Sequence, residues 1–188
     1  MIGNLTSDCS VAGRQALVSG DLVMGLRWDR HDTGPGQSAR HADLDAFCVL
    51  FDEHGRPVEV VHPGETRNRN GSVVHTGDST TGASAWDDER IFVFLDALPK
   101  DISTLAFVVR SATRRAFGDI AGASCHLSDA TTECVYLRLD LQPYGYSLAR
   151  CMAILDRQRE GWHILDRAAA GSIAVAAETL SLDTADKA

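Results

Sequence analysis

Residues 75–95 read HTGDSTTGASAWDDERIFVFL, a turn-rich loop followed directly by a β-branched and aromatic run. The loop opens on one carboxylate, Asp78, and closes on three in succession at residues 87–89. Hydroxyl side chains and glycines fill the space between these acids. Hard cations such as Ca²⁺ take several oxygen ligands from flexible loops, both carboxylates and backbone carbonyls. The stretch therefore predicts a cation site at the rim of a β-sheet.

Short apolar segments continue the strand pattern on both sides of this loop. Ten of them, separated by turn-forming residues, predict strands at 22–28, 44–51, 57–61, 72–76, 91–95, 105–110, 123–127, 134–141, 148–155 and 162–165. Segment 44–51 is apolar with little alternation, which is typical of a strand buried on both faces. Short strands at this spacing predict an all-β fold, a sandwich of two mainly antiparallel sheets.

Only residues 172–180 read as helical, with Ser172 as the expected N-cap. We find no internal repeat or linker, so the 188 residues are expected to form a single domain. Its core is expected at about 20–168, with the N-terminal segment 1–19 and the C-terminal tail 172–188 peripheral.

Composition excludes several classes of function. The formal net charge of −8 argues against binding to nucleic acid, which requires a positive field. No window reaches the roughly 18 consecutive apolar residues of a membrane span, so no transmembrane segment is expected. Five widely spaced cysteines without a Cys-x-x-Cys motif predict reduced thiols and a cytoplasmic location.

A second acidic cluster stands at the start of segment 44–51. Asp43 and Asp45 are two residues apart, so on a strand their carboxylates point to the same side. Like charges at that distance repel unless a cation or a proton neutralises them. In the first cluster, Glu89 is at position twelve when Asp78 is counted as one, which is the offset of an EF-hand loop. The detailed match is poor, because Gly82 is at position five and no helices flank the loop.

The motifs resemble the TerD family of bacterial tellurium-resistance and stress proteins. The resemblance covers about 22–162 and rests on GLRWD at 25–29, DLDA at 43–46, NGSVVHTGD at 70–78, Thr81-Gly82 and DDE at 87–89. It implies a β-sandwich that binds calcium at one end, with the metal ligands Asp43, Asp45, Asp78, Asp87, Asp88 and Glu89 and loop carbonyls near Thr80 and Gly82. It also implies a non-enzymatic interaction module whose partners are other proteins of a stress-response complex, with peripheral membrane association through such partners.

The family's loop carries further acids and glycines where this chain has residues 83–86, ASAW. Ligand charge and loop flexibility tune calcium affinity, so the resemblance implies one or two ions. Two alternatives stay open. One is a divalent-metal-dependent hydrolase that uses the same carboxylates with His41 or His75 as base. The other is a TerD-like interaction module that has lost its metal.

Overall fold

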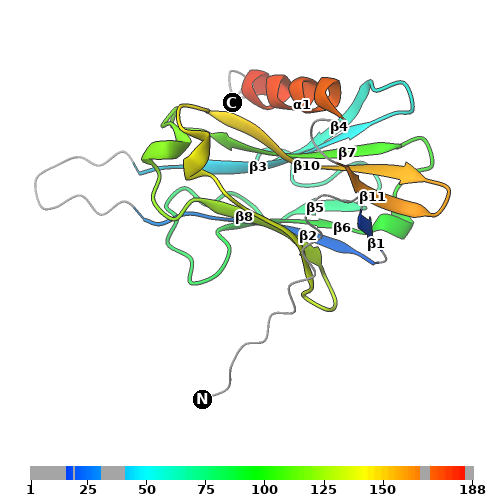
Figure 1. The fold of residues 1–188 in the computed structure, drawn as a ribbon, viewed down its shortest axis with the longest axis horizontal. Coiled ribbons are helices and arrows are strands. Elements are labelled where there is room, and N and C mark those ends of the chain that lie inside the picture. Colours follow the sequence, from blue (N-terminus) through cyan, green and yellow to red (C-terminus); the bar gives the residue numbers. More distant parts are fainter. Residues whose placement is uncertain (1–15, 19, 31–40, 166–169, 185–188) are drawn as a thin grey trace, which may run out of the picture.

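The computed structural model describes residues 16–18, 20–30, 41–165 and 170–184. Two antiparallel sheets lie face to face, and one helix covers the outer side of the larger sheet (Figure 1). The strands are β1 (Ala16–Val18), β2 (Leu22–Arg27), β3 (Leu44–Phe51), β4 (Pro57–Val61), β5 (Val73–His75), β6 (Glu89–Val93), β7 (Thr104–Ser111), β8 (Ser124–Asp129), β9 (Val135–Asp140), β10 (Ala149–Gln158) and β11 (Gly161–Leu165). Three 3₁₀ turns are η1 (Leu95–Ala97), η2 (Phe117–Asp119) and η3 (Gln142–Tyr144), and the helix is α1 (Gly171–Asp183).

The six-stranded sheet has the order β1-β11-β10-β7-β3-β4, and the five-stranded sheet has the order β5-β6-β2-β8-β9. The predicted all-β sandwich with a short C-terminal helix is therefore confirmed. Every strand predicted from the sequence is present, with ends that differ by at most a few residues.

All eight residues of strand β3 are buried, which explains why its sequence shows no alternation of apolar and polar residues. Leu44, Ala46 and their alternates face the core between the sheets. Phe47, Val49 and Phe51 face the opposite way, into a second cluster that Ala174 and Ala177 of α1 help to close. A strand with apolar contacts on both faces needs no polar positions.

Both chain ends depart from expectation. Residues 16–18, placed in the peripheral segment, form β1 and pair with β11 at the sheet edge. The tail contributes α1, which packs on the sheet and buries Ala174, Ala177 and Ser181. Ser172 is not the N-cap, because the helix begins at Gly171 with Ala170 in the capping position and no side-chain cap.

Cysteine usage also differs from expectation at one position. Cys48, Cys125 and Cys151 are buried and not disulfide-bonded, which is how a structural thiol in an apolar core behaves. Burial raises the pKa of the Cys125 thiol to about 12. Cys134 is disulfide-bonded, so the expectation of uniformly reduced thiols is wrong there. The cysteines consequently give no argument for a reducing compartment.

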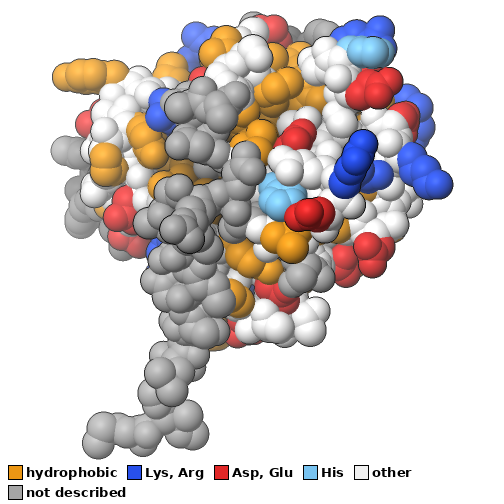
Figure 2. Space-filling view, turned by 45° about the vertical axis from the view of Figure 1, so that its right-hand side comes forward, with side chains coloured by type: hydrophobic (Ala, Val, Ile, Leu, Met, Phe, Trp, Pro, Cys, Tyr) orange, Lys and Arg blue, Asp and Glu red, His pale blue; other side chains and the backbone are white. Residues whose placement is uncertain are grey.

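The surface matches the acidic composition. On the face shown in Figure 2, acidic and basic side chains are interspersed, and the basic ones gathered toward the right-hand edge have acidic neighbours. This face offers no continuous positive field for a polyanion. Within the described residues, no helix is long and apolar enough to cross a membrane.

Candidate metal centre

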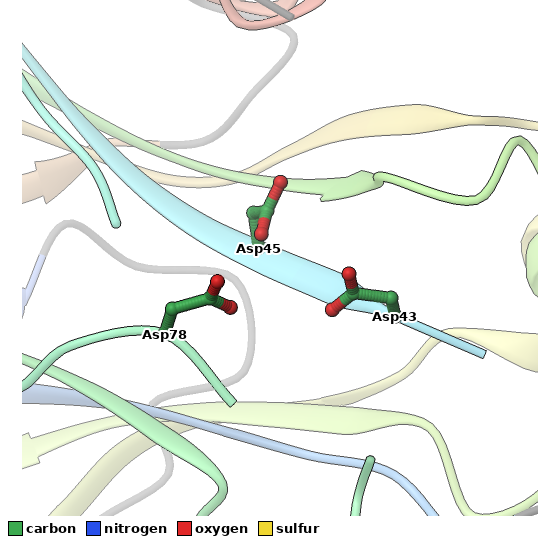
Figure 3. A group of neighbouring side chains, drawn as sticks. All are labelled: Asp43, Asp45 and Asp78. Carbon is green, nitrogen blue, oxygen red and sulfur yellow. The ribbon is translucent and has the colours of Figure 1, made fainter. Parts of the chain in front are cut away.

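Three predicted ligands from two separate parts of the chain meet at one end of the sandwich. Asp43 and Asp45 lie at the start of β3, and Asp78 lies in the loop between β5 and β6 (Figure 3). Each offers a carboxylate oxygen, and these atoms all lie within 4.8 Å of one another. The cluster thus joins a strand of the six-stranded sheet to a loop of the five-stranded sheet.

Strand pairing leaves this end of β3 open. Strand β4 pairs with β3 only from Cys48 onward, where Cys48 lies opposite Val61. Among the described residues the Ala46 N–H therefore has no strand partner on that edge, and it donates to Glu89 Oε2 at 2.7 Å. A buried carboxylate from the other sheet takes the place of a strand, which brings the β5–β6 loop against the acidic start of β3.

Asp43 carries a carboxylate that the protein does not fully compensate. Its Oδ1 atom is buried and has no hydrogen-bond partner among the described residues. Burial, together with the charges of Asp45, Asp78 and Glu89, raises the pKa of Asp43 to about 7 against a lowering effect of Arg110. A carboxylate held this way is stabilised by either a proton or a cation.

Asp45 already has a cationic partner. Its Oδ2 atom accepts a hydrogen bond from Arg110 Nε at 3.1 Å and a second, short one from Nη2. The two residues lie directly opposite each other on β3 and β7. Sequence reasoning missed Arg110, although antiparallel pairing of the two predicted strands would have placed an arginine beside the aspartate.

Glu89 is fully buried and organises the loop. Its Oε1 atom accepts from the Ser79 N–H at 3.2 Å, in addition to the Ala46 bond at Oε2. Burial raises the pKa of Glu89, against lowering by His75 and by these two backbone donors.

His75 supports the same carboxylate from inside the fold. Its Nδ1 atom accepts from the Gly77 N–H at 2.9 Å, so the ring proton of the neutral imidazole lies on Nε2. That Nε2 lies 3.3 Å from Glu89 Oε2, without the alignment of a hydrogen bond. These contacts indicate that His75 positions the loop and the Glu89 carboxylate around the site.

Asp87 points away from the cluster of three aspartates. It accepts from Arg90 Nε at 2.9 Å and lies 3.2 Å from His126 Nε2 on the outer face of the five-stranded sheet. Burial acts to raise the pKa of Asp87, but the bonds from His126 and Arg90 outweigh it and the net shift is downward. Gly25 leaves room for this pair, because a Cβ there would lie 2.6 Å from Asp87 Oδ2.

The two carboxylate oxygens of Asp88 also accept hydrogen bonds from the protein itself. Its Oδ2 accepts from the Trp28 N–H at 3.1 Å, and its Oδ1 accepts from the Ser84 N–H at 3.0 Å. These bonds fix the loop against the end of β2. Asp88 therefore closes the loop whether or not it also contacts an ion.

The remaining predicted positions lie within the same loop. Thr80 is exposed, whereas Gly82 is buried with φ +60 and packs against the Trp28 ring. A side chain at Gly82 would collide with that ring as well as requiring a left-handed backbone. Trp86 is 72% exposed and stands at the surface beside the acidic triplet.

The donor set of the cluster is made of oxygen alone. Among the described residues, the cluster of potential metal ligands consists of the three aspartates and includes no histidine. Carboxylate donors suit calcium or magnesium, whereas zinc and iron sites in proteins usually include histidine or cysteine. His41 and His75, the bases required by the hydrolase alternative, do not belong to this cluster.

Comparisons with known proteins agree with this architecture. The family model described as "TerD domain" matches residues 11–174. The chain is 35% identical over 120 residues to tellurium resistance protein TerZ of Serratia marcescens, covering 64% of this chain and 62% of that protein. It is 33% identical over 127 residues to general stress protein 16U of Bacillus subtilis, covering 64% of each. The matched segments thus span slightly under two thirds of these relatives.

Solved structures show the same fold. One is described as a homologue of the telluride resistance protein TerD from Streptomyces coelicolor, with TM-score 0.67 at 20% identity over 80% of this chain and 88% of that chain. Another, a protein described as of unknown function, matches with TM-score 0.67 at 23% identity over 78% and 86% of the two chains.

Proposed function

This chain belongs to the TerD family, as the motif resemblance predicted, and from that premise we propose that it is a non-enzymatic, calcium-binding stress-response protein. Its curated relatives are tellurium-resistance and stress proteins. In this proposal the ion holds together loops from two sheets, and the stabilised end of the sandwich serves as an interaction module for other proteins of a stress-response complex.

The observation that carries the proposal is the unsatisfied oxygen of Asp43. Buried polar atoms in proteins nearly always have a partner, and those without one call for an explanation. In the part of the chain that the structure describes, Asp43 Oδ1 has none, and it lies in a group of three carboxylates whose ligand atoms fall within 4.8 Å of one another. These residues fit a hard cation bound by oxygen atoms.

We assign Asp43, Asp45 and Asp78 to direct binding of the ion. Calcium, when bound, supplies the positive charge that offsets their mutual repulsion. Glu89 positions the Asp78 loop through Ser79 and adds negative potential at Asp43. Asp87 and Asp88, together with the turn at Gly82, shape the loop through bonds and packing of their own, and backbone carbonyls near Thr80 complete the expected ligand set.

Exposed aromatic side chains at the same end support an interaction role. Trp86 is 72% exposed in the loop that carries Asp78, and Tyr146 is 97% exposed in the turn between η3 and β10. Amphipathic aromatic residues are enriched where proteins contact partners. An ion that fixes the loop would hold Trp86 in one place and so present it to a partner.

Calorimetric titration with calcium, combined with thermal unfolding, tests the proposal. Binding to the folded chain alone stabilises it by about 2.7 kcal/mol at a hundredfold excess over Kd. We expect measurable heat of binding and a rise in Tm that a chelator reverses. Absence of both at millimolar calcium contradicts the proposal and favours the module that has lost its metal. A scan with magnesium, manganese and zinc, with a phosphodiesterase assay, tests the hydrolase alternative.

A further inference from the structure

Arg110 connects the aspartate cluster to the C-terminal helix. Its Nε and Nη2 donate to Asp45 Oδ2, and its Nη1 donates to the Ser181 carbonyl of α1 at 3.1 Å. The guanidinium also lies 5.0 Å from the centre of the Phe47 ring. The Arg110 side chain is only 12% exposed, and its three contacts come from two elements, with Asp45 and Phe47 on β3 and Ser181 on α1.

The Ser181 carbonyl lies in the last turn of α1, where helical carbonyls lack partners within the helix. A cation at that end also matches the negative pole of the helix. No lysine, arginine or histidine of α1 itself occupies its last turn. Arg110 thus supplies from β7 the positive charge that the helix lacks.

We propose that Arg110 sets the cation affinity of the aspartate cluster and couples cation binding to the docking of the C-terminal end of α1. This inference rests on the proposed calcium site. An ion bound to Asp45 must share that carboxylate with a fixed guanidinium, and two positive charges a few ångströms apart repel strongly in a partly buried site. Arg110 therefore lowers calcium affinity, and calcium in turn loosens the Arg110–Asp45 pair.

Linkage makes this effect reciprocal. When the pair with Asp45 loosens, Arg110 loses the contact that braces it beneath the helix. The bond to the Ser181 carbonyl then weakens, and the last turn of α1 opens more often. Ion binding at the loop end of the sandwich therefore weakens the packing of the end of α1 on the outer face of the sheet.

Four proteins separate this coupling from a purely structural ion pair. These are the wild-type full chain, Arg110→Gln, Arg110→Lys and the control Arg56→Gln, whose exposed pair with Asp52 is remote from the site. Each is titrated with calcium chloride by calorimetry. Amide hydrogen exchange of residues 171–184 is then measured with and without calcium.

We expect Arg110→Gln to bind calcium about tenfold more tightly than the wild type, within the usual range of coupling between sites. Arg110→Lys keeps the charge but not the planar fork, so its affinity should stay within about threefold of wild type. Calcium should speed exchange at the end of α1 in the wild type and in Arg56→Gln. Neither Arg110 variant should show this response.

Wild-type affinity in Arg110→Gln, with calcium binding otherwise intact, overturns the inference and leaves the proposed function standing. A calcium effect on α1 that persists in both Arg110 variants overturns the coupling. If the wild type does not bind calcium but Arg110→Gln does, Arg110 controls the affinity. The proposed calcium function of the native chain then fails. If no variant binds calcium, both proposals fall.

Discussion

The Glu89 carboxylate on β6 accepts a hydrogen bond from the Ala46 N–H on β3 at 2.7 Å, and so joins the two sheets at the end that carries the aspartate cluster. The same carboxylate accepts from the Ser79 N–H, which follows Asp78 in the loop. One buried side chain thus fixes both the strand that carries Asp43 and the loop that carries Asp78. The geometry of the candidate site depends on this tie.

Glu89→Gln tests the tie between the sheets. An amide retains the shape of the carboxylate but cannot accept at both of its ends, so one backbone donor loses its partner. We expect a loss of about 1–3 kcal/mol in the free energy of unfolding, measured by urea denaturation. Glu53→Gln, at a side chain 82% exposed, is the matched control and should be neutral. Equal stability of the two variants would count against a structural role for Glu89.

Gly25→Ala tests the packing of Asp87 over the five-stranded sheet. The new Cβ would lie 2.6 Å from Asp87 Oδ2 and would displace Asp87 and His126. Overpacking of this kind costs about 1–3 kcal/mol, which thermal or urea unfolding detects. Gly171→Ala is the control, because nothing lies within 4 Å of a Cβ there. If Gly25→Ala is as stable as Gly171→Ala, the arrangement around Asp87 is wrong.

The pKa of Asp43 predicts how stability depends on pH in calcium-free buffer. The folded protein raises this pKa from 3.8 to about 7, so it binds the proton more tightly than the unfolded chain does. Asp43 therefore stabilises the fold below about pH 4, and this contribution is lost as pH rises to about 7.

Asp43→Asn removes that titration and also the repulsion that the Asp43 charge exerts on Asp45, Asp78 and Glu89. A unit of pKa shift corresponds to about 1.4 kcal/mol, and solvent screening reduces the effect at this half-buried group, so above pH 7 the variant should be more stable than the wild type by about 1–2 kcal/mol. The two proteins should converge toward pH 4. Urea unfolding from pH 4 to 8 measures the gap, and parallel curves across that range would contradict the assignment.

Trp86 offers an optical report on the site. Trp28 and Trp162 are 1% and 6% exposed, whereas Trp86 is 72% exposed in the loop that we expect calcium to order. Calcium should therefore change the tryptophan emission of the wild type through Trp86. In Trp86→Phe we expect this change to vanish while the calorimetric affinity stays within about twofold, since the Trp86 side chain is largely exposed. Retention of the full emission change in the variant would exclude Trp86 as its source.

The fold could be predicted from the sequence because apolar residues recur with a different period in strands and in helices. Strand 44–51 was predicted with its observed ends, since an uninterrupted apolar run has few alternatives in a sandwich. Strand β1 was missed because three residues, with Leu17 49% exposed, carry no readable period. The prediction of Ser172 as the N-cap was wrong, because a capping residue can be identified only when the first residue of the helix is known.

Only part of the candidate site could be predicted from the sequence. Asp43, Asp45 and Asp78 meet as the crowding of charge suggested. The triplet at 87–89 looked uniform in sequence, yet each member has a different partner: His126 for Asp87, the Trp28 N–H for Asp88 and the Ala46 N–H for Glu89. Those partners lie 39 to 60 residues away, so only the fold reveals which carboxylates are engaged by the protein itself.

Calcium-dependent thermal stability of the wild type and Asp78→Asn tests the central claim most directly. Asp78 is exposed, and Asp78→Asn removes a proposed ligand without disturbing the core, so the metal-free variant should melt within about 2 °C of the wild type, as expected for a surface substitution. Asp96→Asn, at an exposed aspartate outside the site, is the control. We predict that calcium raises the Tm of the wild type and of Asp96→Asn and leaves that of Asp78→Asn unchanged. An equal rise in all three proteins, or in none, would contradict a calcium site built on Asp43, Asp45 and Asp78.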